Sequence, residues 1–215
     1  MPPHGETRRR MLDAAIAVLR ERGAAGLSIG EVLARSGCPR GSVYHHFPGG
    51  RTELLRQTLD YADQSYTAMI QRAADRGGSA GVLERMLSFW TTVLVDSDFR
   101  AGCPISASAV NPAVGQEELA SRAAQIHLGW RDAVAAVFAS EGEAPDGAQE
   151  RATTALAVLD GAVTLCRITR SIEPLQTVAQ SLRTLPGATH APVVDDRAAG
   201  VRQTRAGATA SRSGS

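Results

Sequence analysis

The chain has 215 residues, of which 43% are hydrophobic and 21% are charged, and its formal net charge is +1. This is ordinary globular composition, and the length suits one domain or a small domain joined to a medium one, so a wholly disordered chain is excluded. No apolar run approaches the roughly eighteen residues of a membrane helix, and the N-terminus has no apolar signal segment, so no membrane association is expected.

Hydrophobic periodicity predicts helices from the start of the chain. In the first helix, apolar residues recur at helical spacing, at Leu12, Ala15, Ile16 and Leu19. Gly23 then provides a helix stop. The segment Ser28–Glu31 matches a capping box, in which the Ser28 hydroxyl accepts an early backbone N–H and Glu31 reaches back to the start of the helix. Gly37 is expected to close this second helix.

A third short helix is predicted directly after the second. Pro39 suits its first turn, where the missing N–H has no partner in any case. Val43 and Phe47 lie one turn apart and share a face, and Pro48 begins a stretch that breaks the helix.

The remainder of the chain continues as helices, with no convincing strand. Their apolar stripes run over Leu55–Ala73, Leu83–Leu94, Leu119–Val137, Leu156–Cys166 and Leu175–Leu185. Loops are expected at Arg76–Gly81 and Glu141–Gly147, and a short broken segment is expected between Gly102 and Pro112. Residues 188–215 contain almost no large apolar side chain, so this tail is expected to be disordered.

The second and third predicted helices form a helix-turn-helix candidate around Gly37-Cys38-Pro39. The second helix of such a unit must enter the DNA major groove with polar groups on its outer face. With Val43 and Phe47 inside, the polar side chains left for that face are those of Arg40, Ser42, Tyr44, His45 and His46. Gly41 leaves space for a phosphate or a base edge to approach closely.

Charge is segregated along the chain in a way that fits this interpretation. Residues 1–56 hold nine arginines and five acidic residues, a net +4, whereas residues 57–185 hold ten arginines and fifteen acidic residues, a net −5. A basic first quarter on an acidic body indicates that the first quarter alone contacts a polyanion.

The ordered motif SIGEVLARSGCPRGSVYHHFPGGRTELL, residues 28–55, closely resembles the signature of the TetR family of transcriptional regulators. The resemblance covers about residues 6–65. Pro48–Arg51, together with Gly102–Ile105 and Leu159–Val163, resembles the LmrA/YxaF-type subgroup. The resemblance implies an all-α fold with an N-terminal three-helix DNA-binding domain at 1–65. It also implies a helical ligand-binding and dimerisation domain at 66–187, followed by the tail at 188–215.

Transferred by position, the resemblance implies DNA contacts for the outer face of the third helix. Arg40 and Ser42 would meet base edges or adjacent phosphates, Tyr44 and His46 would donate to phosphates, and His45 would lie along the groove.

Two helix starts carry further implied contacts. The Arg51 region, where the family usually has Lys, would clamp a phosphate at a helix N-terminus, and Ser28 could do the same. The Arg8–Arg10 cluster opposes the dipole of the first helix, which fits a position near DNA. It could equally be a solvated chain end.

The acidic body is implied to hold a small, largely apolar or aromatic ligand. The candidate ligand-binding residues are Tyr66, Met69, Met86, Trp90, Cys103, His127, Trp130 and Cys166. A pocket lined by aromatic residues and Met suits such a molecule, although the same residues at helical spacing can simply form core.

A homodimer is implied through the helices of about residues 150–185. A stripe of small residues at Ala152, Ala155 and Ala162 beside Gly161 would allow two copies to pack as a four-helix bundle, unless it serves only the chain's own core. A two-fold dimer would place its reading helices about 34 Å apart on a pseudo-palindromic operator.

The sequence therefore predicts a DNA-binding regulator, with a repressor released by its ligand as the leading hypothesis. An activator, and a helical interaction module with a degenerate DNA head, remain alternatives. An enzyme is not expected, because there is no Gly-rich phosphate loop and no motif-supported Ser/His/Asp set. The cysteines Cys38, Cys103 and Cys166 are too widely spaced for a disulfide framework or a zinc site, which suits the reducing cytoplasm. No metal or cofactor is expected.

Overall fold

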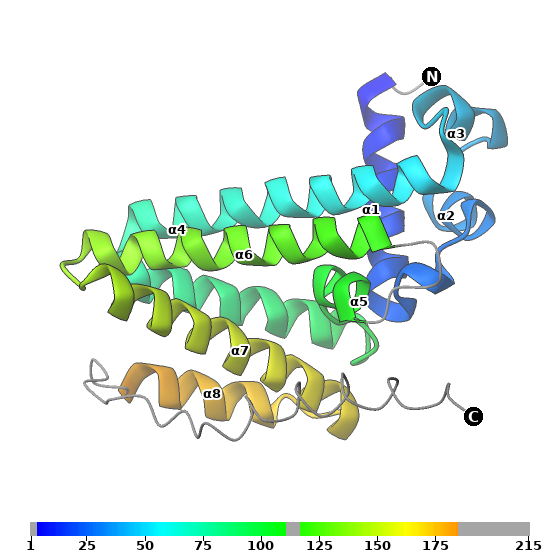
Figure 1. Ribbon diagram of the computed structural model, residues 1–215. Coiled ribbons are helices and arrows are strands. Elements are labelled where there is room, and N and C mark those ends of the chain that lie inside the picture. Colours follow the sequence, from blue (N-terminus) through cyan, green and yellow to red (C-terminus); the bar gives the residue numbers. More distant parts are fainter. Residues whose placement is uncertain (1–3, 111–116, 185–215) are drawn as a thin grey trace, which may run out of the picture. The chain divides into compact units, whose positions relative to one another are not determined.

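The computed structural model describes residues 4–110 and 117–184, and these residues form helices with no strand among them (Figure 1). The helices are α1 (His4–Arg22), α2 (Ile29–Ser36), α3 (Arg40–His46), α4 (Gly50–Asp96), α5 (Pro104–Val110), α6 (Glu117–Ser140), α7 (Pro145–Thr169) and α8 (Glu173–Thr184), with a 3-10 turn, η1, at Ala24–Gly26. The expected all-α fold is confirmed. The predicted disordered tail lies outside the described residues.

Glycine and serine set the limits of the first helices as the sequence indicates. Gly23 follows α1 with a φ of 66°, and Gly37 ends α2 with a φ of 63°, a backbone region that favours glycine. Ser28 Oγ accepts the Glu31 N–H at 3.1 Å, which caps α2. The Glu31 carboxylate accepts from Arg35 Nε at 2.8 Å, so it adds an i,i+4 ion pair along the helix.

The helix-turn-helix forms from α2 and α3, joined by the turn at residues 37–39. Pro39 precedes the helix as its N-cap, with an extended ψ of 146°, so α3 begins one residue later than the expected position of Pro39 in the first turn. Val43 and Phe47 are fully buried and belong to the same hydrophobic core as the buried residues of α1 and α4.

The long element α4 is two helices folded back on each other. Gly77 and Gly78 leave the helical conformation, which confirms a break in the expected loop, but only these two residues leave the helix. Tyr66 and Phe89 lie eleven residues on either side of the break, and their ring centroids are 5.6 Å apart. A straight helix would separate them by about 35 Å. We call residues 50–76 the first arm of α4 and residues 79–96 the second arm.

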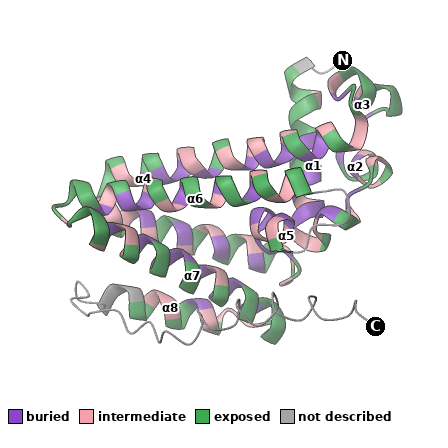
Figure 2. Cartoon of the chain, viewed as in Figure 1, coloured by how far each residue is buried: buried purple, intermediate pink, exposed green. Residues whose placement is uncertain are grey.

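The body is built by α6 packing on α4, α5 and α7, with α8 packed on α7. Buried residues lie on the inner faces of these helices and exposed residues on the outer faces (Figure 2). α1 also packs on α4 and α5, so the N-terminal helices share a core with the body. Both arms of α4 contribute to that core, through Tyr66 and Met69 on one side and Met86 and Trp90 on the other.

α7 differs from the expectation in two ways. It begins at Pro145, inside the loop expected at Glu141–Gly147, because proline is well suited to the first turn of a helix. The small residues expected at an interface, Ala152, Ala155 and Ala162, are buried within the chain. That assignment was wrong, because periodicity identifies a face of a helix but not what covers it.

The outer face of α7 is apolar instead. Val158, Leu165 and Ile168 are 36%, 51% and 71% exposed and lie on one face with Gly161, where an added Cβ would meet only open space. By length and composition α7 could cross a membrane, with a mean hydropathy of 1.3, but its inner face is packed against α6 and α8. A helix of a soluble fold that has one apolar face in the core and a second apolar face at the surface can reach the same mean hydropathy as a membrane helix.

The first arm of α4 passes straight through residue 65, where the boundary between the two domains is expected. This arm begins beside α3 and ends in the body. The limits of the two domains therefore stay predictions, while the continuous helix is the feature that links the N-terminal helices to the body.

Candidate functional site

The outer face of α3 exposes the residues expected to contact DNA. Arg40, Gly41, Tyr44 and His45 are exposed, and Ser42 and His46 are half-buried. Tyr44 is 64% exposed, which is unusual for a large aromatic side chain with no binding role. An added Cβ at Gly41 would meet no atom within 4 Å, so the backbone there is open to a close approach.

Contacts beneath α3 fix its position. The Arg8 guanidinium lies 6.0 Å from the centre of the buried Phe47 ring, and its Nη2 donates to Gln57 Oε1 at 2.6 Å. Cys38 is buried in the turn, where its thiol is 3.8 Å from the Thr7 carbonyl oxygen, so it fills space as expected. Arg10 donates to the Ser36 carbonyl at the end of α2. Two arginines of the basic cluster therefore also hold the helix-turn-helix together.

Arg51 is bound inside the fold. Its Nε donates to the Leu27 carbonyl at 2.7 Å, and its Nη2 donates to the Ala24 carbonyl at 2.6 Å. The guanidinium thus ties the start of α4 to the turn between α1 and α2. A guanidinium has five N–H groups, so a phosphate contact by Arg51 stays a prediction.

The N-terminus of α4 carries its own carboxylate. Glu53 Oε2 accepts the Gly49 N–H at 2.6 Å, and Glu53 Oε1 accepts from Gln57 at 2.7 Å. A carboxylate here is favoured by the helix dipole, and it occupies one of the amides that a phosphate would use. At the start of α2, the exposed Ser28 hydroxyl accepts the Glu31 N–H and keeps its own proton to donate.

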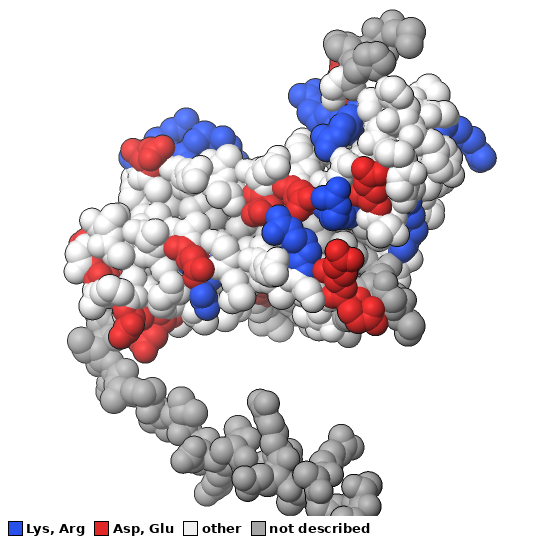
Figure 3. All heavy atoms as spheres, turned by 45° about the horizontal axis from the view of Figure 1, so that its top comes forward, with Lys and Arg blue, Asp and Glu red and all other residues white. Residues whose placement is uncertain are grey.

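Charge on the surface follows the division along the sequence. Arginines lie around the end of the molecule that carries α1, α2 and α3, a second basic group lies at the opposite end of the body, and acidic groups lie between them (Figure 3). The exposed Arg9 and Arg40 belong to the N-terminal end. Such a surface attracts a polyanion to that end of the molecule.

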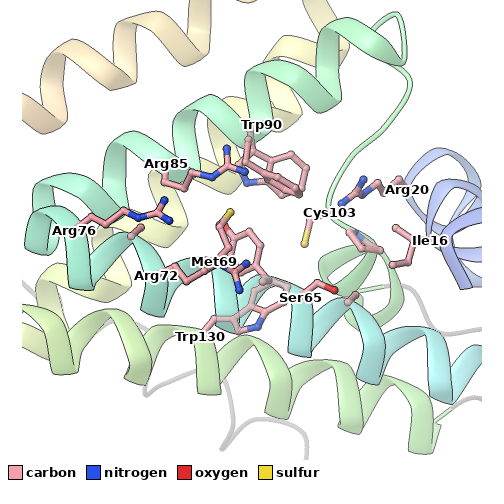
Figure 4. A pocket seen from close by; sticks show the side chains of 15 residues that line it. Ile16, Arg20, Ser65, Met69, Arg72, Arg76, Arg85, Trp90, Cys103 and Trp130 are labelled. Carbon is pink, nitrogen blue, oxygen red and sulfur yellow. The ribbon is translucent and has the colours of Figure 1, made fainter. Parts of the chain in front are cut away.

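The body contains a cavity of about 330 Å³ between α1, both arms of α4, the start of α5 and α6 (Figure 4). Five of the eight candidate ligand-binding residues line it, namely Tyr66, Met69, Trp90, Cys103 and Trp130. Met86 and Cys166 are buried but are not part of this wall, and neither is His127. The volume is at the lower end of the range for small-molecule sites.

Aromatic rings form the middle of the cavity. The Tyr66 ring lies 4.2 Å from the Trp130 ring and 5.6 Å from the Phe89 ring, between centroids. Trp130 Nε1 donates to Asp63 Oδ1 at 2.9 Å, which fixes the indole. Burial raises the pKa of Tyr66 well above its ordinary value, so this phenol stays neutral. The wall offers flat, apolar surface to a planar ligand.

Four arginines at the cavity were not anticipated from the sequence. Arg76 and Arg85 enter from one end and Arg20 from the other, with Trp90 and Met69 between them, and Arg72 lies beside Met69 (Figure 4). A local signal existed, because Arg72 and Arg76 follow Met69 at helical spacing on one face of α4. The contribution of Arg20 depends on the packing of α1 against the body, which no local pattern predicts.

The polar groups beside the cavity do not form a catalytic set. Ser106 Oγ donates to Asp160 Oδ2 at 3.0 Å, and His127 Nε2 lies 3.1 Å from the same oxygen, so the carboxylate separates the hydroxyl from the imidazole. Burial raises the pKa of the Cys103 thiol, which disfavours a reactive thiolate. Within residues 4–110 and 117–184, no three His, Cys, Asp or Glu side chains gather to hold a metal ion.

Two family models match the chain, one on each part of the fold. Residues 11–58 match the model described as bacterial regulatory proteins, tetR family. Residues 79–181 match the C-terminal domain described as transcriptional regulator LmrA/YxaF-like. The first match covers the helix-turn-helix, and the second covers the body from the second arm of α4 to α8.

Relatives along most of the chain agree with these matches. An uncharacterized HTH-type transcriptional regulator of Mycobacterium tuberculosis is 41% identical over 183 residues, covering 83% of this chain and 93% of that protein. The HTH-type transcriptional regulator LmrA of Bacillus subtilis is 22% identical over 83% of this chain and 96% of its own length. The crystal structure of a regulatory protein TetR from Rhodobacter sphaeroides superposes with a TM-score of 0.70, at 15% identity, over 81% of this chain and 95% of that one.

Proposed function

Because the chain belongs to the TetR family of DNA-binding transcriptional regulators, with an LmrA/YxaF-like C-terminal domain, we propose that it is a repressor released from its operator by a small molecule. The observation that carries the proposal is that the first arm of α4 runs without a break from the turn after the DNA-reading helix to the cavity in the body. A protein with this role acts in the cytoplasm and catalyses no reaction.

DNA recognition in this proposal depends on α3. Its exposed Arg40 reads base edges or adjacent phosphates in the major groove, and Tyr44 and His46 donate to the phosphate backbone. Because Val43 and Phe47 anchor the inner face of α3, the outer face is presented rigidly. Phosphate contacts supply affinity, and base contacts supply the choice of sequence.

The outer face of α7 supports a homodimer. Val158, Leu165 and Ile168 form an exposed apolar stripe with Gly161 at its centre, and glycine allows a partner helix to approach closely. A two-fold pair of α7 and α8 helices would bury this stripe in a four-helix interface. The dimer would then present two copies of α3 to a pseudo-palindromic operator.

The cavity is connected to α3 by two routes. Phe47 accepts the Gly50 N–H at 2.8 Å at the start of α4, and Tyr66 and Met69 line the cavity on the same arm. Ile16 of α1 also lines it, while Arg10 of α1 holds the end of α2. A ligand that binds better to a conformer with altered positions of α1 and α4 shifts the population away from the DNA-bound state.

Fluorescence anisotropy with a labelled fragment from just upstream of the chain's own gene tests DNA reading. Titrations at two salt concentrations, with random DNA as competitor, separate specific binding from phosphate attraction. We expect competitor-resistant binding. Arg40→Ala should weaken it by about five- to 150-fold, which corresponds to the loss of roughly 1–3 kcal/mol for a base contact. Tyr44→Phe should weaken it without changing the melting temperature.

The matched control is Arg100→Ala, an exposed arginine outside the helix-turn-helix. It should leave binding unchanged. If neither the upstream fragment nor sites selected from the whole genome bind with resistance to competitor, the proposed operator reader is wrong.

A further inference from the structure

The cavity in the body carries an excess of positive charge that the fold itself does not neutralise. Its wall includes Arg20, Arg72, Arg76 and Arg85 and no Asp or Glu. None of these four arginines forms an ion pair among the described residues, whereas arginines elsewhere on the body, such as Arg122 and Arg151, do. Among the residues that the structure describes, no acidic side chain lines this cavity to balance its arginines.

Arg20 is the most informative of the four. Its Nε is shielded from solvent and has no hydrogen-bond acceptor within the described part of the chain. Its guanidinium lies 5.3 Å from the centre of the Phe89 ring. Burial lowers the pKa of Arg20, yet a guanidinium stays charged at neutral pH. A buried, charged donor without a partner costs free energy, which an acceptor entering the cavity would recover.

Nearby carboxylates are occupied and do not turn to Arg20. Asp63 accepts from the Trp130 indole at 2.9 Å, and Asp160 accepts from Ser106 at 3.0 Å. Neither carboxylate forms an ion pair with Arg20 in the described part of the chain, so the Arg20 Nε is open to an acceptor supplied by a ligand.

The aromatic part of the cavity wall indicates which kind of molecule could bind beside the arginines. Trp90 and Trp130 lie between Arg20 and the pair Arg76 and Arg85 (Figure 4). Tyr66 and Phe89 also line the cavity. A planar ring system can lie against this aromatic wall, and a carboxylate matches a guanidinium with two parallel hydrogen bonds. The cavity volume of about 330 Å³ limits the ligand to a small molecule.

We propose that the effector of this regulator is a small planar aromatic carboxylate, whose carboxylate pairs with Arg20 while its rings lie against the aromatic wall that Tyr66, Phe89 and the tryptophans form. The inference rests on the proposed function in treating this cavity as the effector site. Arg76 and Arg85 attract the anion and receive a second acidic group where the ligand has one.

A matched pair of fluorescent probes tests the charge preference on the full-length protein without DNA. The probes are 1-anilinonaphthalene-8-sulfonate and N-phenyl-1-naphthylamine, which share their rings and differ in the anionic group. We expect the anionic probe to bind at least about tenfold more tightly, as charge-assisted hydrogen bonds allow. 2-Naphthoate should displace it at least about tenfold more effectively than 2-naphthamide does.

Variants assign the preference to residues. Arg20→Gln should abolish the difference between the two probes, while the exposed pair Arg76→Gln and Arg85→Gln should reduce it only in part. Arg100→Gln, an exposed arginine away from this cavity, should preserve it. Melting temperatures establish that each variant is folded, and the double variant keeps the test valid if Arg20→Gln does not fold.

Two outcomes would overturn the inference: equal binding of both probes by the unmodified chain, or a preference unaffected by all three cavity substitutions. Operator release is measured separately, by adding 2-naphthoate and 2-naphthamide to the anisotropy assay. Release by the neutral compound alone overturns the anion preference and leaves the regulator proposal intact. Preferential, Arg20-dependent anion binding without any release supports the anion site and counts against ligand-controlled repression.

Discussion

At the scale of single residues, arginine serves two different purposes in this chain. Some arginines complete the fold, as Arg51 does by donating to the Ala24 and Leu27 carbonyls. Others have a side-chain nitrogen without a hydrogen-bond acceptor in the described chain and line a space that a ligand could enter. Arg20, in the cavity wall, is the example. The distinction comes from geometry, because the residue type and the charge are the same in both cases.

Arg51 provides a prediction about stability. Arg51→Ala should lower the free energy of unfolding by about 2 kcal/mol, since two charge-assisted hydrogen bonds to carbonyls are lost. Arg51→Lys should recover only part of this, because an ammonium group cannot match the planar fork that spans both carbonyls. Urea unfolding measures both values.

Arg56→Ala, one turn further along α4, is the control for Arg51. Arg56 makes a surface ion pair with Asp60 at 3.3 Å, so its loss should change stability by no more than about 0.5 kcal/mol. If Arg51→Ala left the free energy of unfolding unchanged but weakened operator binding, Arg51 would contribute to DNA binding and not to stability.

At the scale of elements, the break in α4 determines which residues form the cavity. The turn at Gly77 and Gly78 brings the second arm back along the first, so that Phe89 and Trp90 face Tyr66. Glu141, from the loop after α6, accepts the Ser79 N–H at 2.6 Å and also its hydroxyl, and thus caps the second arm. The contact between Glu141 and Ser79 thus helps to hold the two arms of α4 in the folded-back arrangement that forms the cavity.

The two glycines at the tip should respond differently to substitution. Gly78 has a φ of 56°, and an added Cβ would lie 2.2 Å from Glu141 Oε1. Gly78→Ala should therefore cost about 1–3 kcal/mol of unfolding free energy. Gly77→Ala is the control, because its added Cβ meets no atom within 4 Å, and it should change stability by about 0.5 kcal/mol or less. Equal losses in thermal or urea unfolding would contradict this account of the turn.

The cap by Glu141 makes stability depend on pH. Hydrogen bonds from the Ser79 hydroxyl and N–H lower the pKa of Glu141 below its ordinary value of 4.5. A depressed pKa in the folded state means that the stabilisation is present above about pH 4.5 and is lost as the pH falls through the folded value. Glu141→Gln should lower the melting temperature at pH 7 but much less at pH 3.

Glu150→Gln, at an exposed position on α7, provides the comparison for Glu141. It should show no such difference between the two pH values. A Glu141→Gln deficit of the same size at pH 3 and pH 7 would exclude the ionised carboxylate as the cap.

At the scale of the whole molecule, the proposed dimer depends on the exposed stripe on α7. Leu165→Asp combined with Ile168→Asp should prevent dimerisation, because burying two carboxylates opposite apolar side chains is costly. The monomer should keep its melting temperature in dilute solution, since both side chains are more than half exposed. Sedimentation velocity gives the oligomeric state, and operator affinity should fall by about a hundredfold or more when one half-site acts alone.

Leu128→Asp, on the outer face of α6, is the control for the stripe. Leu128 is 49% exposed, close to the 51% of Leu165. A dimer that survives the α7 double substitution but dissociates in Leu128→Asp would place the interface on α6.

Local signals were sufficient for the helices and for the DNA-reading unit. The cap at Ser28, the stops at Gly23 and Gly37 and the buried pair Val43 and Phe47 each act over a few residues, so the sequence predicts them directly. The cavity is formed by residues from α1, both arms of α4 and α6. Its bulky residues could be predicted from the sequence, but its arginines could not. The buried alanines of α7 show the same limit, because a helical period does not identify the neighbouring helix.

The uninterrupted first arm of α4 acts as a lever. Tyr66, at the cavity, is sixteen residues from Gly50, beside α3, which is a distance of about 24 Å along the axis. A tilt of only about 5° pivoted at Tyr66 would displace Gly50 by about 2 Å, taking the rise per residue of an α-helix. In a two-fold dimer the two displacements can add to about 4 Å, whereas a hydrogen bond tolerates only a few tenths of an ångström of stretching. In the proposed mechanism, a ligand that moves the cavity walls very slightly would therefore detach both reading helices at once.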